Sequence, residues 1–115
     1  MKDIHGSGLR GETLACEYLR RNGYEVVATR FRAQGGEIDI IARDGTYLCF
    51  IEVKYRPDGR IASGLGAVTP DKRARMRRAA QAYMAGQRHA GRMRFDMMEV
   101  TRAGVWHIKN TGAGA

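Results

Sequence analysis

Two strand-like runs joined by Asp44-Gly45 constrain the fold of this chain most strongly. The runs are EIDIIAR and TYLCFIEVKYR, and both are rich in β-branched and aromatic residues. Asp-Gly between two such runs is one of the strongest local signals for a β-hairpin. We therefore predict an antiparallel hairpin over residues 37–56, with Asp44-Gly45 at the centre of a two-residue turn.

This turn predicts which side chains of the hairpin share a face. It pairs Arg43 with Thr46, and further along it places Asp39 opposite Phe50 and Glu37 opposite Glu52. Paired residues point to the same side of a sheet. One face is then core, formed by Ile38, Ile40, Ala42, Tyr47, Cys49, Ile51 and Val53. The other face is apolar near the turn, at Ile41, Leu48 and Phe50, and then gathers Glu37, Asp39, Glu52 and Lys54.

The polar end of this second face has the residue types of a phosphodiester-cleaving centre. Asp39 and Glu52 become diagonal neighbours, roughly 7–8 Å apart at the backbone, which lets two carboxylates converge on one divalent cation. Hard oxygen ligands favour Mg²⁺ or Mn²⁺ over Zn²⁺. Lys54 projects beside them, where an amine can orient water or stabilise a pentacovalent phosphate. The alternative is a salt-bridged hairpin in which Lys54 neutralises Glu52.

The rest of the chain predicts one mixed α/β domain over residues 1–110. We expect a helix over 7–22 closed by Gly23, a strand over 24–33 and a turn at 34–36. A glycine-rich loop follows the hairpin at 57–68, and Thr69-Pro70-Asp71 begins a helix that runs to about residue 87. Strands over 93–101 and 105–110 precede a tail, 111–115, that we expect to be disordered. The element order is α-β-β-β-α-β-β.

Each helix carries polar residues of interest beside its apolar stripe. Glu12 falls on the stripe of Ala15, Cys16 and Leu19, so it is either a further metal-site carboxylate or a first-turn residue that favours the helix dipole. In the second helix, Lys72 is expected to point toward the carboxylates from the side of the buried residues Met76, Ala79, Ala80 and Tyr83. Arg73, Arg77 and Arg78 are expected to face solvent, either contacting nucleic-acid phosphates or forming a solvated surface.

Charge and cysteine content narrow the partners and the compartment. Twenty Lys and Arg face twelve Asp and Glu, giving a formal net charge of +8 that favours nucleic acid over a membrane surface as partner. Cys16 and Cys49 lack metal-site spacing, so we expect buried free thiols and a cytoplasmic protein. The N-terminus lacks an apolar signal region, and no apolar run has the length of a membrane span. We expect structural roles for Asp96 and His107.

The chain contains the motifs GEIDIIARDG and FIEVKYR, together with GLRGETLACEYLRRNGYEVVATRFRAQGGEID, TPDKRARMRRAAQAYM and RFDMMEV. In this combination, the chain resembles the YraN-type family of bacterial proteins. The resemblance covers about residues 8–108. That family is similar to the restriction-endonuclease-like superfamily and to archaeal Holliday-junction resolvases. The resemblance implies a central mixed sheet flanked by helices, with a PD-(D/E)xK site carried by Asp39 and by Glu52-Val53-Lys54. Glu12 and Lys72 match superfamily positions, whereas Ile38 replaces the proline before Asp39.

Together these patterns support a metal-dependent nuclease acting on DNA, with branched or recombination intermediates as candidate substrates. Cutting a junction favours a homodimer, because two strands require two symmetric sites. The alternative is a non-catalytic nucleic-acid-binding or adaptor protein that keeps the nuclease fold. A structural ion-pair cluster that binds a partner protein is the third hypothesis.

Overall fold

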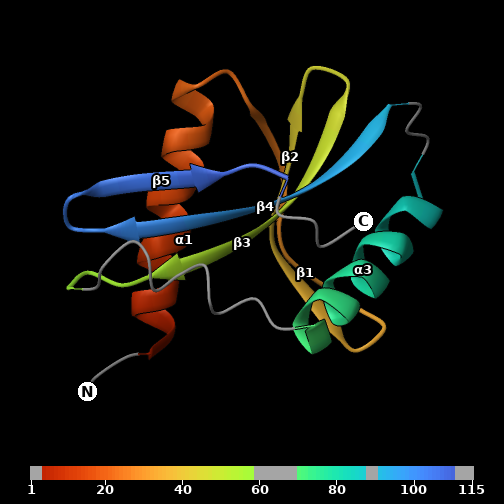
Figure 1. Ribbon diagram of the computed structural model, residues 1–115, viewed down its shortest axis with the longest axis horizontal. Coiled ribbons are helices and arrows are strands. Elements are labelled where there is room, and N and C mark those ends of the chain that lie inside the picture. The colour runs from red at the N-terminus through yellow and green to blue at the C-terminus, as the bar shows by residue number, and fades with distance from the viewer. Residues whose placement is uncertain (1–3, 59–69, 88–90, 111–115) are drawn as a thin grey trace.

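A computed structural model describes residues 4–58, 70–87 and 91–110 of the chain (Figure 1). Its elements follow the predicted order and form a five-stranded sheet with two helices. They are α1 (Ile4–Arg21), β1 (Glu25–Ala33), β2 (Gly36–Asp44), β3 (Tyr47–Tyr55), α3 (Pro70–Ala85), β4 (Arg92–Thr101) and β5 (Gly104–Ile108). The predicted α/β class is therefore confirmed. Most of the predicted glycine-rich loop, Thr69 and the predicted tail lie outside the described residues.

The sheet is mixed, as the resemblance implied. Its strand order is β1-β2-β3-β4-β5, and every neighbouring pair is antiparallel except β3 and β4, which are parallel. Parallel neighbours require a long crossover connection, and α3 lies in the segment between these two strands. β3 therefore joins the antiparallel strands β1 and β2 to the parallel strand β4. The connection between β3 and β4 packs α3 against one face of the sheet.

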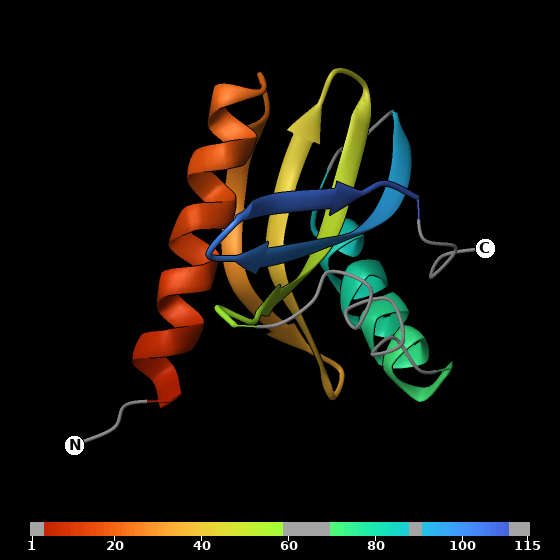
Figure 2. The ribbon, with the colours of Figure 1, turned by 60° about the vertical axis from the view of Figure 1, so that its left-hand side comes forward.

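The two helices cover opposite faces of the sheet (Figure 2). Under α1 lies a cluster that includes Ala15, Cys16, Leu19, Ile40, Ala42, Cys49 and Ile51. Under α3 lies a second cluster of Ile38, Ile41, Leu48, Phe50, Met76, Ala79, Ala80 and Phe95. Burial of both faces explains the near-continuous apolar runs of β2 and β3. Both cysteines are buried free thiols, as predicted.

Ile38 is a correction to the predicted faces. It was expected beside Ile40, but it packs in the α3 cluster. Opposite this step, between the pairs Thr29↔Ile40 and Phe31↔Ile38, Arg30 has a positive φ of 51°. A left-handed residue within a strand turns the backbone locally, so the end of the β1–β2 hairpin is rotated relative to the rest of the sheet.

The predicted hairpin is present, but its register differs by two residues. Asp44 pairs with Tyr47 and Arg43 with Leu48, so Gly45-Thr46 forms the turn in place of Asp44-Gly45. Gly45 has φ 60°, which suits the first central position of a two-residue hairpin turn. Because the shift is even, it keeps the predicted side-chain faces of β3 relative to β2.

Gly36 brings α3 directly against the β1–β2 hairpin. A Cβ built at this glycine would overlap the backbone carbonyl of Arg75. We expect Gly36→Ala to lower the free energy of unfolding by about 1–3 kcal/mol, because α3 must shift outward to relieve the overlap. Urea unfolding would measure this change. Gly86→Ala is the matched control, because among the described residues its Cβ meets only Tyr83 O, at 3.9 Å. Equal effects of the two variants would contradict the close approach.

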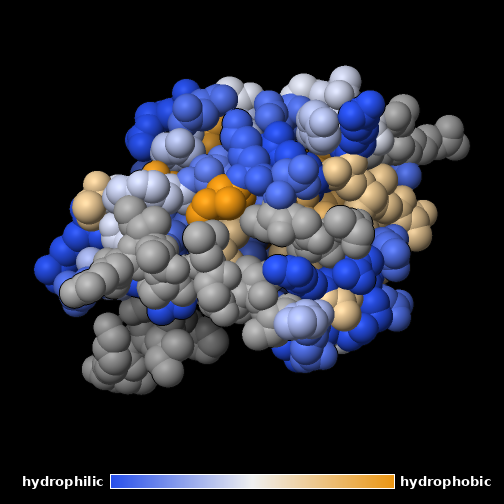
Figure 3. Space-filling model, in the orientation of Figure 1, coloured by the Kyte–Doolittle hydropathy of each residue, from blue (hydrophilic) through white to orange (hydrophobic). Residues whose placement is uncertain are grey.

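The side chains on the face in Figure 3 are mostly hydrophilic, with a small hydrophobic patch near its centre. Within the described ranges, the helices are too short or too polar to cross a bilayer.

Candidate active site

Asp39 and Glu52 meet at the point where the ladder between β2 and β3 opens. The pairs run from Asp44↔Tyr47 to Ile40↔Ile51, so Asp39 and Glu52 are the residues that follow the last pair on each strand. Here Asp39 Oδ2 accepts a hydrogen bond of 2.7 Å from the Val53 N–H. A carboxylate thus satisfies a backbone donor of β3 at this step. The predicted pairing of Asp39 with Phe50 is wrong, because Phe50 pairs with Ile41.

The electrostatics at Asp39 reflect crowding by other carboxylates. Burial and the charge of Glu52 raise the pKa of Asp39 to about 7, against the hydrogen bond from Val53. The charges of Glu37 and Glu12 add to the increase in the pKa. Glu52 is only 7% exposed. Neighbouring carboxylates of this kind, one buried and one half-buried, favour a proton or a cation between them.

Two lysines converge on Glu52. Lys72 Nζ contacts Glu52 Oε2, and Lys54 Nζ lies 3.4 Å from the same oxygen. Burial and the neighbouring Lys72 lower the pKa of Lys54, although Glu52 opposes this. Burial would also lower the pKa of Lys72, but its hydrogen bonds to Glu52 and Lys54 outweigh that effect and raise it. Lys54 is therefore the amine that loses its proton more readily.

Glu12 lies beside this centre without joining it. Its side chain is 13% exposed and pairs with Arg30 at 3.4 Å, and burial raises its pKa. It lines a separate hollow of about 300 Å³ between α1 and β1. Its charge nevertheless contributes to the raised pKa of Asp39. The structure thus places Glu12 within electrostatic reach of Asp39, paired with an arginine of β1.

A cavity of about 610 Å³ opens over the paired carboxylates. It lies between the end of the β1–β2 hairpin and the first turns of α3. Its lining consists of Arg32, Ala33, Gly35, Gly36, Glu37, Asp39, Glu52, Lys72, Arg75 and Met76. The cavity therefore combines an acidic floor with three basic side chains.

The donor set fits Mg²⁺ or Mn²⁺ held by two carboxylates. Mg²⁺ is commonly bound by one or two carboxylates, with water and substrate phosphates completing its shell. Asp39 and Glu52 supply such a pair. In the described part of the chain, no cluster of three or more His, Cys, Asp or Glu is placed to hold a metal ion. The predicted three-carboxylate set with Glu12 is thus not assembled.

The arginines of α3 differ from the prediction in their exposure. Arg78 is exposed and donates to Gln34 O at 3.3 Å, but Arg73 and Arg77 are half-buried. Their Nε atoms are buried, with no hydrogen-bond partner among the described residues. Helical spacing places both in the row that continues into Ala80 and Met84, which pack against the sheet. Their role in nucleic-acid binding stays a prediction.

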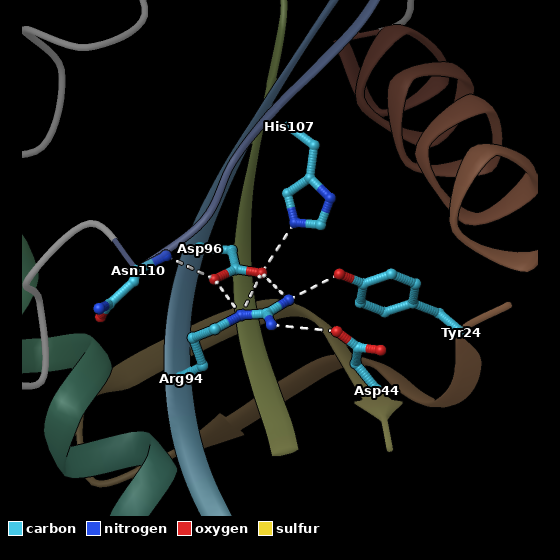
Figure 4. Close-up of polar contacts among 6 residues, drawn as sticks. All are labelled: Tyr24, Asp44, Arg94, Asp96, His107 and Asn110. Atoms are coloured by element: carbon cyan, nitrogen blue, oxygen red, sulfur yellow. Dashed lines mark hydrogen bonds and ion pairs between the residues drawn. The ribbon is translucent and has the colours of Figure 1, made fainter. Parts of the chain in front are cut away.

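A buried polar network on the α1 side of the sheet was not anticipated from the sequence (Figure 4). At its centre, Asp96 accepts hydrogen bonds from Arg94, from the Asn110 N–H at 2.9 Å and from His107 Nε2 at 2.7 Å. Arg94 also contacts Tyr24 and Asp44. Burial would raise the pKa of Asp96, but the hydrogen bonds from His107, Arg94 and Asn110 hold it below its usual range. The structural roles expected for Asp96 and His107 agree with this packing.

Glu99 is a second buried acid that the sequence analysis missed. It is 0% exposed and pairs in register with Lys54 across β3 and β4. Arg56 Nε lies 3.6 Å away, and neither carboxylate oxygen of Glu99 has a hydrogen-bond partner in the described ranges. Burying a glutamate within the apolar run DMMEV costs free energy unless a cation accompanies it. An acidic residue inside an apolar strand was therefore the sequence signal for this buried acid.

Comparison with known proteins places the chain among bacterial relatives. The model of the uncharacterised protein family UPF0102 matches residues 11–100. A UPF0102 protein of Geobacter metallireducens is 41% identical, over 90% of this chain and 88% of its own length. One from Chlorobium chlorochromatii is 43% identical over 81% and 72%, and one from Idiomarina loihiensis is 36% identical over 82% and 84%. These names carry no activity.

Proposed function

We propose a function for this chain, which belongs to the uncharacterised protein family UPF0102, from the chemistry of its own site. The function is metal-dependent hydrolysis of phosphodiester bonds in DNA. One observation carries the proposal: two carboxylates line the same open cavity, with two amines on one of them. Such a set can bind a cation and a phosphate at the same place.

Asp39 and Glu52 are the residues that would hold Mg²⁺ or Mn²⁺. When bound, the cation neutralises charge on phosphate oxygens and lowers the pKa of a coordinated water. Glu12 lies outside this pair, and its role in the proposed site is limited to the negative charge that it adds near Asp39. The proposed metal ligands therefore come from β2 and β3.

The lysines supply complementary proton and charge chemistry. Lys54, whose pKa is lowered, can orient the attacking water and accept its proton. Lys72, whose pKa is raised, stays protonated and can stabilise the negative charge that develops on the phosphate. Both amines lie at Glu52, so these two roles act within one small volume.

DNA is the partner that the charge of the chain favours. The formal net charge is +8, and basic side chains line the cavity that holds the carboxylates. Action on branched intermediates would require two copies of the site, and a homodimer of this chain would supply them.

A second candidate function, non-catalytic nucleic-acid binding, is favoured by the ion pairs at Glu52. The two amines compensate this carboxylate without a metal, and Asp39 is satisfied in part by the backbone of β3. A protein that only binds DNA would keep the cavity and its basic rim and would not need a cation.

A cleavage assay separates the two candidates. The purified protein is incubated with Mn²⁺ and labelled linear, single-stranded and four-way-junction DNA. We expect metal-dependent cutting by the wild type, and a rate lower by about a hundredfold or more for Asp39→Asn. The variant lacks the negative charge that would hold the cation against the phosphate in the transition state. Asp58→Asn is the matched control, since Asp58 is 80% exposed and pairs only with Arg102 among the contacts described.

Equal cutting by Asp39→Asn and the wild type would overturn the proposed catalytic site. DNA binding without any metal-dependent cutting would support the second candidate. Absence of both binding and cutting would exclude both functions.

A further inference from the structure

We propose that Arg32 and Arg75 hold the phosphates of a nucleic-acid strand on the two sides of the carboxylate cavity. The inference rests on the proposed function. It narrows the substrate to a nucleic-acid strand that carries further phosphates beside the phosphodiester that is cut. We call these two residues the arginine pair. Neither arginine is among the α3 residues that the sequence predicts to contact nucleic acid.

The arginine pair comes from two different walls of the cavity. Arg32 belongs to β1 and pairs in register with Glu37, the residue next to Gly36. The backbone carbonyl of Arg75, on α3, lies against Gly36 itself. The hairpin wall and the helix wall therefore each contribute one arginine close to the same glycine. Both side chains line the cavity together with Asp39 and Glu52.

Both side chains are available for an anion. Arg32 is 75% exposed and Arg75 is 49% exposed, and their ion-pair partners, Glu37 and Asp71, are themselves 41% and 80% exposed. The pairs are separated by 3.6 and 3.5 Å. Exposed ion pairs of this kind contribute little to stability, so a phosphate can replace the carboxylate at little cost.

The arrangement favours a polymer of phosphates over a small anion. A guanidinium binds a phosphate through two parallel hydrogen bonds, which fixes its orientation as well as its position. The cavity floor is acidic, so an isolated anion would be repelled from it unless a cation were bound there. A strand held at both walls brings its intervening phosphodiester over Asp39 and Glu52.

The test compares two double variants that remove the same charge. Arg32→Ala with Arg75→Ala removes the arginine pair. Arg43→Ala with Arg102→Ala is the control, because these arginines also belong to exposed ion pairs, with Glu25 at 3.7 Å and Asp58 at 3.3 Å. The control residues lie at the β2–β3 and β4–β5 turns, away from the β1–β2 turn that forms one cavity wall (Figure 1).

Binding of a labelled oligonucleotide in Ca²⁺, over a series of salt concentrations, gives the first readout. We expect loss of the arginine pair to weaken binding by about tenfold and to reduce the salt slope by about 1 to 2. The control should change both quantities much less. Equal losses in the two double variants would overturn the inference, because net charge alone would then explain the binding. Thermal unfolding verifies that both double variants are folded.

Hydrolysis in Mn²⁺ gives the second readout. We expect the arginine-pair variant to raise KM for the oligonucleotide more than it lowers kcat. Its activity on the oligonucleotide should fall relative to that on bis(p-nitrophenyl) phosphate, a diester without neighbouring phosphates. A proportional fall on both substrates would overturn the inference. If the wild type hydrolyses neither substrate, the proposed function fails, and the binding comparison alone still decides the role of the arginine pair.

Discussion

We expect Asp96→Ala to lower the free energy of unfolding by about 3–5 kcal/mol, the largest stability effect predicted for this chain. Asp96 is 1% exposed and its carboxylate accepts hydrogen bonds from β4, from β5 and from Asn110 after β5. The substitution would leave Arg94, whose side chain is 10% exposed, without its main counter-charge. Chemical unfolding at pH 7 measures the change, with Asp71→Ala as an exposed control expected to stay within about 0.5 kcal/mol.

The pH dependence identifies the cause of this loss. The folded state holds the pKa of Asp96 below its usual range. A carboxyl group of this kind stabilises the folded state above the unfolded pKa of about 4, and the contribution is lost as pH falls through the folded pKa. The difference between wild type and variant should therefore shrink in acid. If Asp96→Ala does not fold, Asp96→Asn, which keeps an acceptor for the Asn110 N–H, provides the same comparison. A loss below 1 kcal/mol that is independent of pH would contradict the prediction.

The second large effect has the opposite sign. Asp39→Asn is expected to raise the free energy of unfolding by about 2–4 kcal/mol at pH 8 in EDTA, because it removes a half-buried charge that Glu52 repels. The asparagine oxygen can still accept the hydrogen bond from the Val53 N–H. A raised carboxyl pKa costs stability once the group ionises. The cost is therefore full above pH 7 and declines as pH falls from about 7 toward 4.

Urea unfolding of wild type and Asp39→Asn between pH 5 and pH 8 measures this effect. The stabilisation should be larger at pH 8 than at pH 5, and Asp71→Asn is the exposed control. Mn²⁺ should stabilise the wild type and not the variant, by about 2.7 kcal/mol at a hundred times its Kd. A variant no more stable than the wild type at pH 8 would show that Glu52 and its lysines already compensate Asp39.

These two acids illustrate different uses of a carboxylate that is shielded from solvent to different degrees. Asp96 is surrounded by donors and serves the fold, since its hydrogen bonds favour the ionised form. Asp39 lies near another acid, Glu52, and lines a cavity. Its ionised form is therefore destabilised at a place that a cation or a substrate can enter. Sites of function are often places where stability is sacrificed.

Some parts of the candidate site followed from local sequence. Period-two alternation along β2 and β3 put Asp39, Glu52 and Lys54 on one face, and an even shift of register did not change that. Capping and turn residues gave the element order and most element ends. The predicted start of α1 was less accurate: the helix begins at Ile4 rather than at residue 7. Its first turn carries no acidic residue, so the usual sequence signal for a helix start is missing there.

The sequence by itself determined the element order, the core faces except at Ile38, and the shared face of the catalytic candidates, because these depend on residue periodicity and on turns within a few residues. Only the tertiary structure decided that Arg32 and Arg75 line one cavity with Asp39 and Glu52, and that Asp96 binds Arg94 and His107. The Arg94 guanidinium reaches Tyr24 and Asp44 from 70 and 50 residues away. Such contacts arise from the packing of whole elements, which no local pattern encodes.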